Sequence, residues 1–415
     1  MKVTLKDIVK KIPRYSKDFP TILFYKLLSL FYTKRKKYQD AWLICERGVE
    51  AKDNGYVLFK YMRENYPDKK VFYLIDFSQK KDYEKVKSLG NLIQYNSFEH
   101  KMAVFYASHL ISAHIGYITP WSYLLFKMLF PNSNKYVFLQ HGITLHNHAN
   151  TFHKLLTGVD LFITATHDEK YSIIKDNNYG YNESQVLLTG FARFDNLLNF
   201  STKRQILFMP TWRTYLVNRN MMKKNQESLI ESFNQSAYFK LLNSFLNNKK
   251  LLMLLEENDI DLIFYPHFEV QKSISLFTFS STKIVVAKKE EYDVQQLLKE
   301  SKMLITDYSS VAFDFAFMKK PLIYFQFDKD EFFNKHYPKG YFDYERDGFG
   351  QVIETEIQLI DEIEDNIKNN FQMLPMFQER VNNTFAYFDN NNCERIYNAI
   401  INFKSLKVKR MKNQE

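Results

Sequence analysis

Short apolar runs recur along the whole chain, and longer stretches of mixed apolar and polar residues separate them. Such runs are typical of buried parallel strands, and the stretches between them have room for helices. In the first half they predict strands at 41–45, 71–75, 92–95, 110–113, 136–139, 161–164 and 186–189. In the second half they predict strands at 206–209, 262–265, 283–286, 303–306 and 322–327. The pattern therefore predicts an α/β protein with two Rossmann-like halves.

The segment 302–327 combines an apolar strand, a hydroxyl-rich turn, a helix and a second apolar strand. Ser309 or Ser310 is suited to the N-cap of a helix that begins at about Val311. A helix that begins at the carboxyl end of a parallel strand presents free N–H groups and a partial positive charge to a phosphate. Thr306 and the two serines add hydroxyl donors, so the segment predicts a phosphate or pyrophosphate site. An ordinary strand, cap and helix explains the local pattern at least as well.

Three other predicted strands also end in reactive polar residues. The stretch 205–213 ends in Pro-Thr-Trp-Arg, 261–267 ends in Pro-His, and 137–142 ends in Gln-His-Gly. Ligands of open parallel sheets bind at the carboxyl ends of the strands. The repetition of this arrangement is therefore more informative than any one of these strand ends, and it predicts a ligand site built from several of them.

Together these stretches resemble the CDP-glycerol glycerophosphotransferase family, which contains teichoic acid primases and polymerases and related capsule enzymes. The resemblance covers about residues 41–388, and the shared motifs appear in the family's order: ERGVEAKDNG, QHG, TGFARFD, MPTWR, YPH, ITDYSSVAFDF and GYFDYERDGFG. It implies a two-domain GT-B-like fold and transfer of an alditol phosphate, such as glycerol or ribitol phosphate, from a CDP-activated donor to a hydroxyl of a lipid-linked acceptor, with CMP leaving. Many relatives read His-Gly-Thr-Pro where this chain reads His-Gly-Ile-Thr at 141–144, a departure that bears on the acceptor.

The resemblance assigns roles to residues of these motifs. His141 is the candidate base for the acceptor hydroxyl, because an imidazole with a pKa of about 6.5 accepts protons near neutrality; the local pattern alone favours an imidazole that caps the strand end. His267 is the second candidate catalytic residue, as a donor to the pyrophosphate or the leaving CMP. Arg213 is expected to bind the same oxygens. Asp307 is expected to orient a neighbouring donor or contact the alditol, and Thr306, Ser309 and Ser310 complete the predicted donor site.

The formal charge of +10 is concentrated at the N-terminus, since residues 1–38 hold eleven Lys and Arg against two Asp. Within this segment, 22–32 predicts an apolar and aromatic helix that is too short to span a bilayer of about 30 Å. This combination predicts a peripheral protein on the cytoplasmic face of an anionic membrane. A helix packed on the enzyme body with its lysines in solvent is the alternative. The stretch 121–130 is a second candidate membrane element, for which core packing is a nearly equal interpretation.

The remaining features limit other functions. Two cysteines, Cys45 and Cys393, suggest neither a disulfide framework nor a cysteine metal site. His146 and His148 could chelate zinc, but no acidic residue lies among them, so we expect no metal site and no required cofactor; a divalent cation bound with the CDP-donor stays open. The sequence contains no recognisable nucleic-acid module. A GT-B glycosyltransferase that uses a sugar nucleotide and a non-catalytic membrane scaffold are the alternative functions.

The sequence also predicts where the parts of the chain begin and end. A basic membrane-associating segment is expected at 1–38, an acceptor domain at 39–199 and a CDP-donor domain at 200–360. Helices at 361–415 are expected to brace the two halves.

Overall fold

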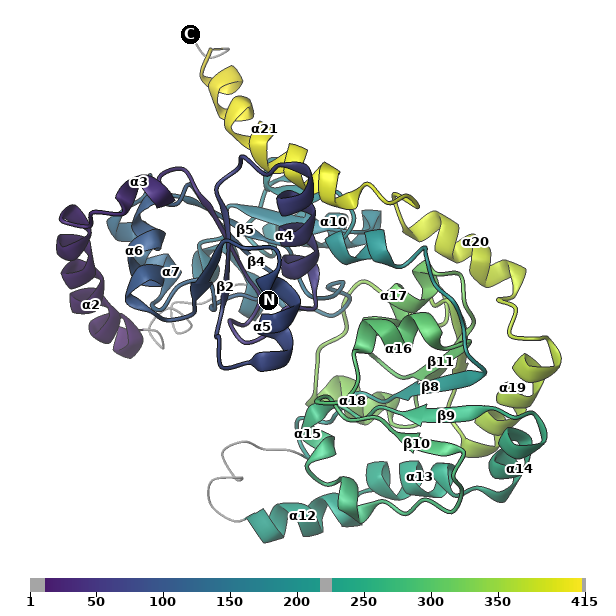
Figure 1. Cartoon of the computed structure of the whole chain (residues 1–415). Coiled ribbons are helices and arrows are strands. Elements are labelled where there is room, and N and C mark those ends of the chain that lie inside the picture. The colour runs from purple at the N-terminus through teal and green to yellow at the C-terminus, as the bar shows by residue number, and fades with distance from the viewer. Residues whose placement is uncertain (1–11, 217–225, 413–415) are drawn as a thin grey trace. The chain divides into compact units, whose positions relative to one another are not determined.

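The computed structural model of the protein describes residues 12–216 and 226–412, and the chain divides into two compact units (Figure 1). Unit 1 contains the chain up to Ile143, His148–Asn196 and the chain from Phe385. Unit 2 contains Thr144–Asn147 and Leu197–Thr384. The chain thus leaves unit 1 briefly after residue 143, and it returns to unit 1 at its C-terminal end.

Unit 1 is built on a sheet in which every neighbouring pair of strands is parallel. Its strands are β1 (Trp42–Cys45), β2 (Val71–Ile75), β3 (Leu92–Gln94), β4 (His109–Ser112), β5 (Lys135–Phe138), β6 (Leu161–Thr164) and β7 (Val186–Leu188). They lie in the order β3-β2-β1-β4-β5-β6-β7. The order reverses between β1 and β4, and ligands of such sheets bind beyond the carboxyl ends of the strands at this point.

Helices cover this sheet, and side-chain caps begin several of them, such as Ser97 before α6 and Thr166 before α10. The helices are α2 (Ile12–Leu30), α3 (Arg35–Tyr38), α4 (Asn54–Asn65), α5 (Lys80–Lys87), α6 (Phe98–Tyr106), α7 (Tyr123–Leu129), α8 (Ala149–Phe152), α9 (Lys154–Thr157), α10 (His167–Ile174) and α21 (Asn392–Lys412), with 3-10 turns η1 (Lys175–Asn177), η2 (Glu183–Gln185) and η3 (Ala192–Asn196).

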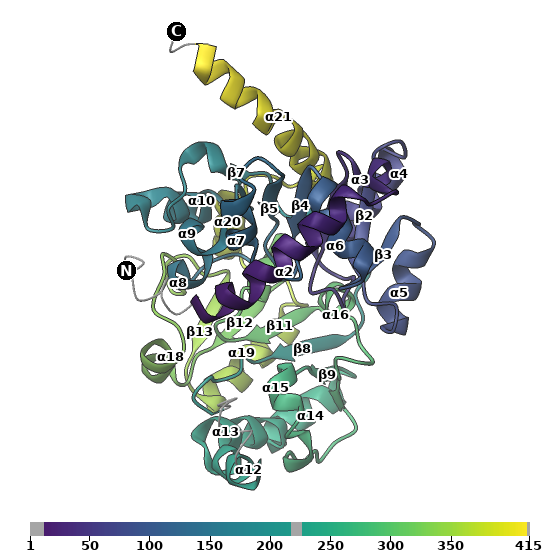
Figure 2. The same ribbon diagram turned by 90° about the vertical axis from the view of Figure 1, so that its left-hand side faces the viewer.

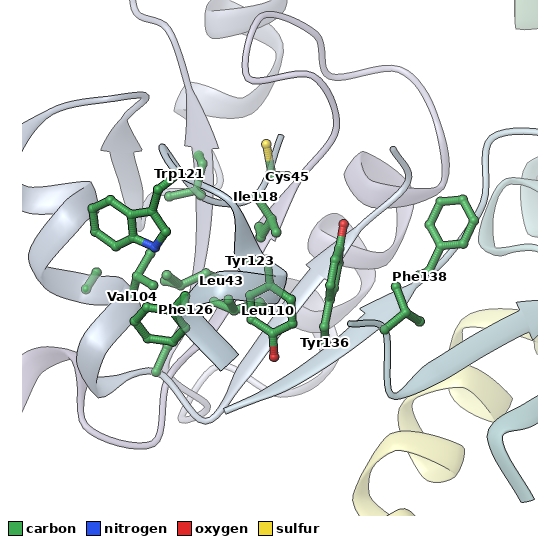
Figure 3. Close-up of a cluster of buried hydrophobic side chains, with 14 of the residues drawn as sticks. Leu43, Cys45, Val104, Leu110, Ile118, Trp121, Tyr123, Phe126, Tyr136 and Phe138 are labelled. Atoms are coloured by element: carbon green, nitrogen blue, oxygen red, sulfur yellow. The ribbon is translucent and has the colours of Figure 1, made fainter. Parts of the chain in front are cut away.

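A core cluster of unit 1 combines large aromatic side chains with aliphatic ones (Figure 3). Trp121 is only 1% exposed and Phe126 is fully buried, and both pack near Val104 and Leu110. The predicted membrane element at 121–130 is therefore mainly a core element, and core packing is the correct interpretation of its central residues. Met128 is the exception, because it is exposed.

Unit 2 repeats the same parallel architecture. Its strands are β8 (Gln205–Met209), β9 (Asp261–Phe264), β10 (Ile284–Val286), β11 (Met303–Thr306), β12 (Leu322–Phe325) and β13 (Gly350–Ile353), in the order β10-β9-β8-β11-β12-β13. The order reverses between β8 and β11. The predicted fold class, α/β with two Rossmann-like units, is confirmed. The edge strand β13 was not predicted from the sequence.

The helices of unit 2 lie on both faces of its sheet, with α13 and α14 on one side and α16 and α17 on the other (Figure 1). They are α12 (Gln226–Gln235), α13 (Ala237–Leu246), α14 (Lys249–Glu257), α15 (Phe268–Gln271), α16 (Val294–Glu300), α17 (Val311–Phe317), α18 (Lys329–Lys335), α19 (Glu356–Lys368) and α20 (Pro375–Thr384), with the 3-10 turn η4 (Ile274–Leu276).

Helix α2 carries most of the described part of the basic N-terminal segment, which continues through α3 to Tyr38, while residues 1–11 lie outside the described residues. It packs against α6 and α7 (Figure 2), with Ile22 buried at the contact. Its outer face exposes a row of large apolar side chains: Phe19, Leu23, Phe24, Leu27 and Leu30, followed by Phe31. Across the described residues, no helix combines the length and the apolar character needed to cross a bilayer.

Candidate active site

Two of the predicted motifs of unit 2 meet at the point where its strand order reverses. Strands β8 and β11 are direct neighbours, with Met209 opposite Thr306 at their carboxyl ends. The Pro-Thr-Trp-Arg turn that follows β8 and the Asp-Tyr-Ser-Ser turn that follows β11 therefore lie side by side. This is the place where the sheet topology positions a ligand site.

Arg213 is held inside this region by two carboxylates. Its Nε and Nη2 atoms donate to Asp328 Oδ2 and Oδ1 at 2.6 and 2.9 Å, and its Nη1 donates to Asp307 Oδ2 at 3.0 Å and to the Thr211 carbonyl at 2.6 Å. The side chain of Arg213 is 0% exposed. Desolvation opposes its charge, but the two carboxylates raise the pKa of Arg213 above its ordinary value. The geometry favours an arginine that organises the site over one that contacts the donor directly.

Asp307 connects the two turns. Its Oδ1 accepts hydrogen bonds from the backbone N–H groups of Thr211 and Tyr308 at 2.9 and 2.7 Å, while its Oδ2 accepts from Arg213. Asp307 therefore binds Arg213 and the backbone of both turns, and its expected role toward a neighbouring donor or the alditol stays a prediction. Tyr308 also donates from its hydroxyl to Asp328 at 3.2 Å, so one network links both turns and the residue before α18.

His267 is placed as a hydrogen-bond donor. Its Nδ1 accepts from the backbone N–H of Glu269 at 3.3 Å at the start of α15, which places the ring proton on Nε2. Its ring stacks on Trp212 with centroids 5.3 Å apart and an interplanar angle of 11°. The two strand-end motifs after β8 and β9 thus touch through these rings, and His267 is fixed by both contacts.

The hydroxyl residues of the predicted phosphate site have different surroundings. Thr306 is buried and donates to the Met209 carbonyl at 2.8 Å, so its hydroxyl joins two strand ends. Ser309 Oγ accepts from the Val311 N–H at 3.3 Å, and Ser310 occupies the N-cap position of α17 without a side-chain cap bond. Both serines are partly exposed. The predicted start of this helix at Val311 is confirmed.

In unit 1, the residue before His141 fixes the local backbone. Gln140 has a φ of +60°, a left-handed conformation that is uncommon for a residue other than glycine. Its buried side chain donates to the Ile163 carbonyl at 2.6 Å and to Glu169 at 3.0 Å. Its own carbonyl accepts from Asn54 Nδ2 at 2.7 Å. These bonds hold the strained turn that presents His141.

The motif at 46–55 supplies a buried polar network beside this turn. Glu46 accepts three backbone N–H groups, from Lys52, Asp53 and Tyr56, at 2.8–3.0 Å. Desolvation, followed by the nearby Asp53 charge, raises the pKa of Glu46 to about 8. Arg193 then pairs with Asp53 at 2.9 Å, which links the motif to η3. The sequence singled out these motifs without giving roles to their residues.

His141 is exposed, and its ring lies against a second histidine. The His114 and His141 rings stack with centroids 4.5 Å apart and an interplanar angle of 12°. The surrounding protein nevertheless lowers the pKa of His141, first by desolvation and then through Arg47 and Arg193. A hydrogen bond to the Ala113 backbone opposes this effect. His141 is thus a neutral imidazole near pH 7, the form that can accept a proton.

Comparison with known proteins identifies the family. The model of the CDP-glycerol:poly(glycerophosphate) glycerophosphotransferase family matches residues 26–402. The chain belongs to this family. The predicted resemblance is therefore confirmed.

Relatives in the family differ in length. The chain is 36% identical over 374 residues to the minor teichoic acid biosynthesis protein GgaB of Bacillus subtilis (strain 168), covering 89% of this chain and 40% of that protein. It is 23% identical over 392 residues to a teichoic acid glycerol-phosphate transferase of Staphylococcus aureus (strain NCTC 8325 / PS 47), covering 86% and 89%. The chain spans about half the length, or less, of GgaB and of two poly(glycerol phosphate) polymerases, at 40%, 46% and 53%.

Solved structures support the fold of the family. A structure of the wall teichoic acid polymerase TagF matches with a TM-score of 0.64 at 18% identity, over 98% of this chain and 100% of that chain. A Staphylococcus aureus MnaA–UDP structure matches with a TM-score of 0.54 at 12% identity, over 89% and 97%. At these identities the similarity concerns the fold alone.

Among residues 12–216 and 226–412, no group of three or more His, Cys, Asp or Glu side chains is arranged to hold a metal ion. His146, one of the two histidines whose spacing suggested a zinc site, packs among the rings of Phe332, Phe333 and Tyr337. Its Nε2 lies 3.3 Å from the Tyr308 carbonyl oxygen.

Proposed function

We propose that the protein transfers an alditol phosphate, glycerol phosphate or ribitol phosphate, from a CDP-activated donor to a hydroxyl of a lipid-linked acceptor in teichoic acid or capsule polymer synthesis. The observation that carries this proposal is the presentation of His141. Gln140 has a strained backbone that is held by hydrogen bonds of its carbonyl to Asn54 and of its side chain to Glu169. It places the exposed, neutral imidazole of His141 just beyond β5. Membership in the family supplies the reaction class, and relatives named for glycerol phosphate and for ribitol phosphate leave both alditols as donors.

In the proposed reaction, the acceptor hydroxyl oxygen attacks the phosphorus atom that carries the alditol. His141 takes the hydroxyl proton, a new P–O bond forms, and the P–O bond to CMP breaks. The Nε2–H of His267 and the partly exposed Ser309 and Ser310 hydroxyls donate to the phosphate oxygens, where negative charge must be stabilised. The site is supported from within by Arg213, Asp307 and Thr306, because their polar groups are hydrogen-bonded to other parts of the protein and not directed at the donor.

We also propose that the protein binds the cytoplasmic face of the membrane through α2. Exposed apolar residues recur on its outer face with helical spacing, and Phe31 just beyond its end is 82% exposed. The exposed residues Lys34 to Lys37 follow directly. An apolar face of this kind can enter the interface, while nearby cations each contribute roughly 1 kcal/mol toward anionic lipids.

Membrane binding is tested by a double substitution, Phe24→Asp with Leu27→Asp, in a vesicle sedimentation assay. We expect reduced binding to anionic vesicles, and we expect wild-type binding to weaken in high salt because surface charges are screened. Ile357→Asp is the control, since Ile357 is also a large exposed apolar residue but lies on α19. Equal binding by all three proteins would contradict the proposal.

The catalytic proposal is tested by incubating the protein with CDP-glycerol or CDP-ribitol and a lipid-linked acceptor, and measuring CMP and product length. We expect CMP, whereas a glycosyltransferase would release CDP or UDP from its sugar nucleotide. His141→Ala should lower the rate by about 10² to 10⁴ while donor binding is largely retained. His267→Ala should weaken calorimetric binding of the CDP-alditol. Near-normal turnover of a folded His141→Ala variant would exclude His141 as the base, and a scaffold would release no CMP.

A further inference from the structure

The residues that follow β4 lie beside those that follow β5, because the two strands are neighbours with Ser112 opposite Phe138. His114 stands two residues past the end of β4, and His141 stands three residues past the end of β5. Sheet topology therefore brings the two imidazoles together. The same strand-end rule that indicated His141 would have indicated His114.

His114 is a rigid and buried neighbour. It is 8% exposed, and its backbone carbonyl accepts from Ser112 Oγ at 2.7 Å and from the Tyr136 hydroxyl at 3.4 Å. Its backbone N–H donates to the same Ser112 hydroxyl at 3.1 Å. Its Nδ1 is buried and has no hydrogen-bond partner among the described residues. The Nδ1 atom of His114 thus stays without a hydrogen bond in this place. The ring instead stacks on His141 and makes an edge contact with Tyr117.

The preceding residue contributes a second constraint. A hydrogen bond joins the His141 ring to the Ala113 backbone and favours the protonated imidazole, as a carbonyl acceptor does. One ring nitrogen of His141 therefore carries its proton toward Ala113. The other nitrogen keeps its lone pair, and it is the one that can take a proton from a substrate.

We propose that His114 is a positioning residue, whose ring covers one face of the His141 imidazole and fixes the direction in which its free nitrogen points. The stack on His114 and the hydrogen bond to Ala113 together restrict the His141 imidazole to one orientation. Displacement of a catalytic group by about 1 Å can cost about 10²-fold in rate, so this control of orientation is sufficient to matter. The inference rests on the proposed role of His141 as the base.

Other groups around His141 determine its protonation together with His114. Arg47 and Arg193 disfavour the imidazolium, whereas Glu50 favours it, and His148 is a further titratable neighbour. Removal of the His114 ring admits water to one face of His141 and so reduces the desolvation that disfavours its imidazolium form. We therefore expect the pKa of His141 to rise toward its ordinary value when His114 is replaced by alanine.

The test compares His114→Ala with His114→Phe in the full chain. We expect His114→Ala to lower kcat by about tenfold to a hundredfold with little change in the KM for CDP-glycerol, and to move the acid limb of the kcat/KM profile toward neutral pH. His114→Phe keeps a flat ring and removes the unpartnered nitrogen, so it should retain most of kcat and an unchanged or higher thermal midpoint. Wild-type kcat and pH profile in His114→Ala, or an equal loss in His114→Phe, would overturn the proposal.

A second measurement separates this inference from the proposed reaction. Histidine-labelled protein without substrate reports the titration of His141 by NMR, and His141→Ala assigns the signal. We expect the His141 titration to shift upward in His114→Ala and to stay near the wild-type value in His114→Phe. If neither the wild-type protein nor any variant releases CMP, the proposed reaction fails. The titration still decides whether the His114 ring controls the pKa of His141. An unchanged titration in His114→Ala would refute that control.

Discussion

The sharpest prediction concerns Arg213, for which a direct role in donor binding and a supporting role give different results. Arg213→Met keeps most of the side-chain volume and removes the guanidinium. Asp307 and Asp328 then remain as two carboxylates in a buried site, where side-chain exposures are 2% and 10%. Both lose their charged partner, although Asp307 keeps its two backbone N–H donors.

The size of the effect follows from the burial of this network. Removal of one partner from a buried ion pair costs about 3–5 kcal/mol, because the remaining charge is left uncompensated. That is a large part of the roughly 5–15 kcal/mol by which a domain is stable. Substitution of the two carboxylates as well, in Arg213→Met/Asp307→Asn/Asp328→Asn, removes the buried charges. We expect the triple variant to recover a substantial part of the lost stability.

Urea unfolding, followed by circular dichroism and by tryptophan fluorescence, to which the neighbouring Trp212 contributes, measures this change in stability. Calorimetric titration with CDP-glycerol under conditions where each variant is folded measures affinity separately. A direct phosphate ligand would instead lose about 1.5–3 kcal/mol of binding with little loss of stability. The supporting role is refuted if the free energy of unfolding of Arg213→Met lies within about 0.5 kcal/mol of the wild-type value. It is also refuted if the triple variant is no more stable than Arg213→Met.

Three further outcomes follow from single residues. Glycine in Gln140→Gly tolerates the left-handed backbone, but the variant loses the side-chain hydrogen bonds to Ile163 and Glu169. We therefore expect a lower rate of CMP release with the fold retained. Unchanged initial rates would contradict a role of these hydrogen bonds in holding His141. Desolvation lowers the pKa of buried His100 to about 4. Between about pH 6.5 and 4 the unfolded state therefore binds more protons than the folded state does. The free energy of unfolding should fall by up to about 3 kcal/mol as the pH decreases through this window. His100→Gln should flatten that dependence in urea titrations. Lys320→Met leaves three backbone carbonyls near the end of α16 without their ammonium donor and should cost about 1–3 kcal/mol by thermal unfolding.

Most strands of the two sheets were predictable from the sequence, because a buried parallel strand appears in it as a short local run of apolar residues. The exception, β13, begins at Gly350, which contributes no apolar side chain to the pattern. A Cβ atom there would lie 1.7 Å from the Leu322 carbonyl oxygen, so the close approach of the two strands requires glycine. This requirement depends on a neighbouring strand and is not visible in the local sequence.

The candidate site was predictable at the level of motifs and less so at the level of contacts. The ends of β5, β8, β9 and β11 were indicated by their polar residues, and the strand order brings the ends of β8 and β11 together. The burial of Arg213 could not be foreseen, because its bidentate partner Asp328 lies 115 residues away in sequence. His114 follows a predicted strand, so the strand-end pattern could have indicated the residue, but its stack with His141 exists only once β4 and β5 are paired.

The return of the chain to unit 1 has a consequence for the order in which the protein becomes structured during synthesis. Asp195 accepts from the backbone N–H groups of Asn392 and Cys393, both at 2.8 Å, and a Cβ at Gly190 would lie 1.9 Å from Asn392 Oδ1. These partners leave the ribosome almost two hundred residues after Asp195 does. Unit 2, whose segments all precede Phe385, can therefore complete its packing while the first unit still lacks its last helix. A fragment intended to represent the first unit would need the residues from Phe385 onward, supplied by circular permutation or as a separate peptide.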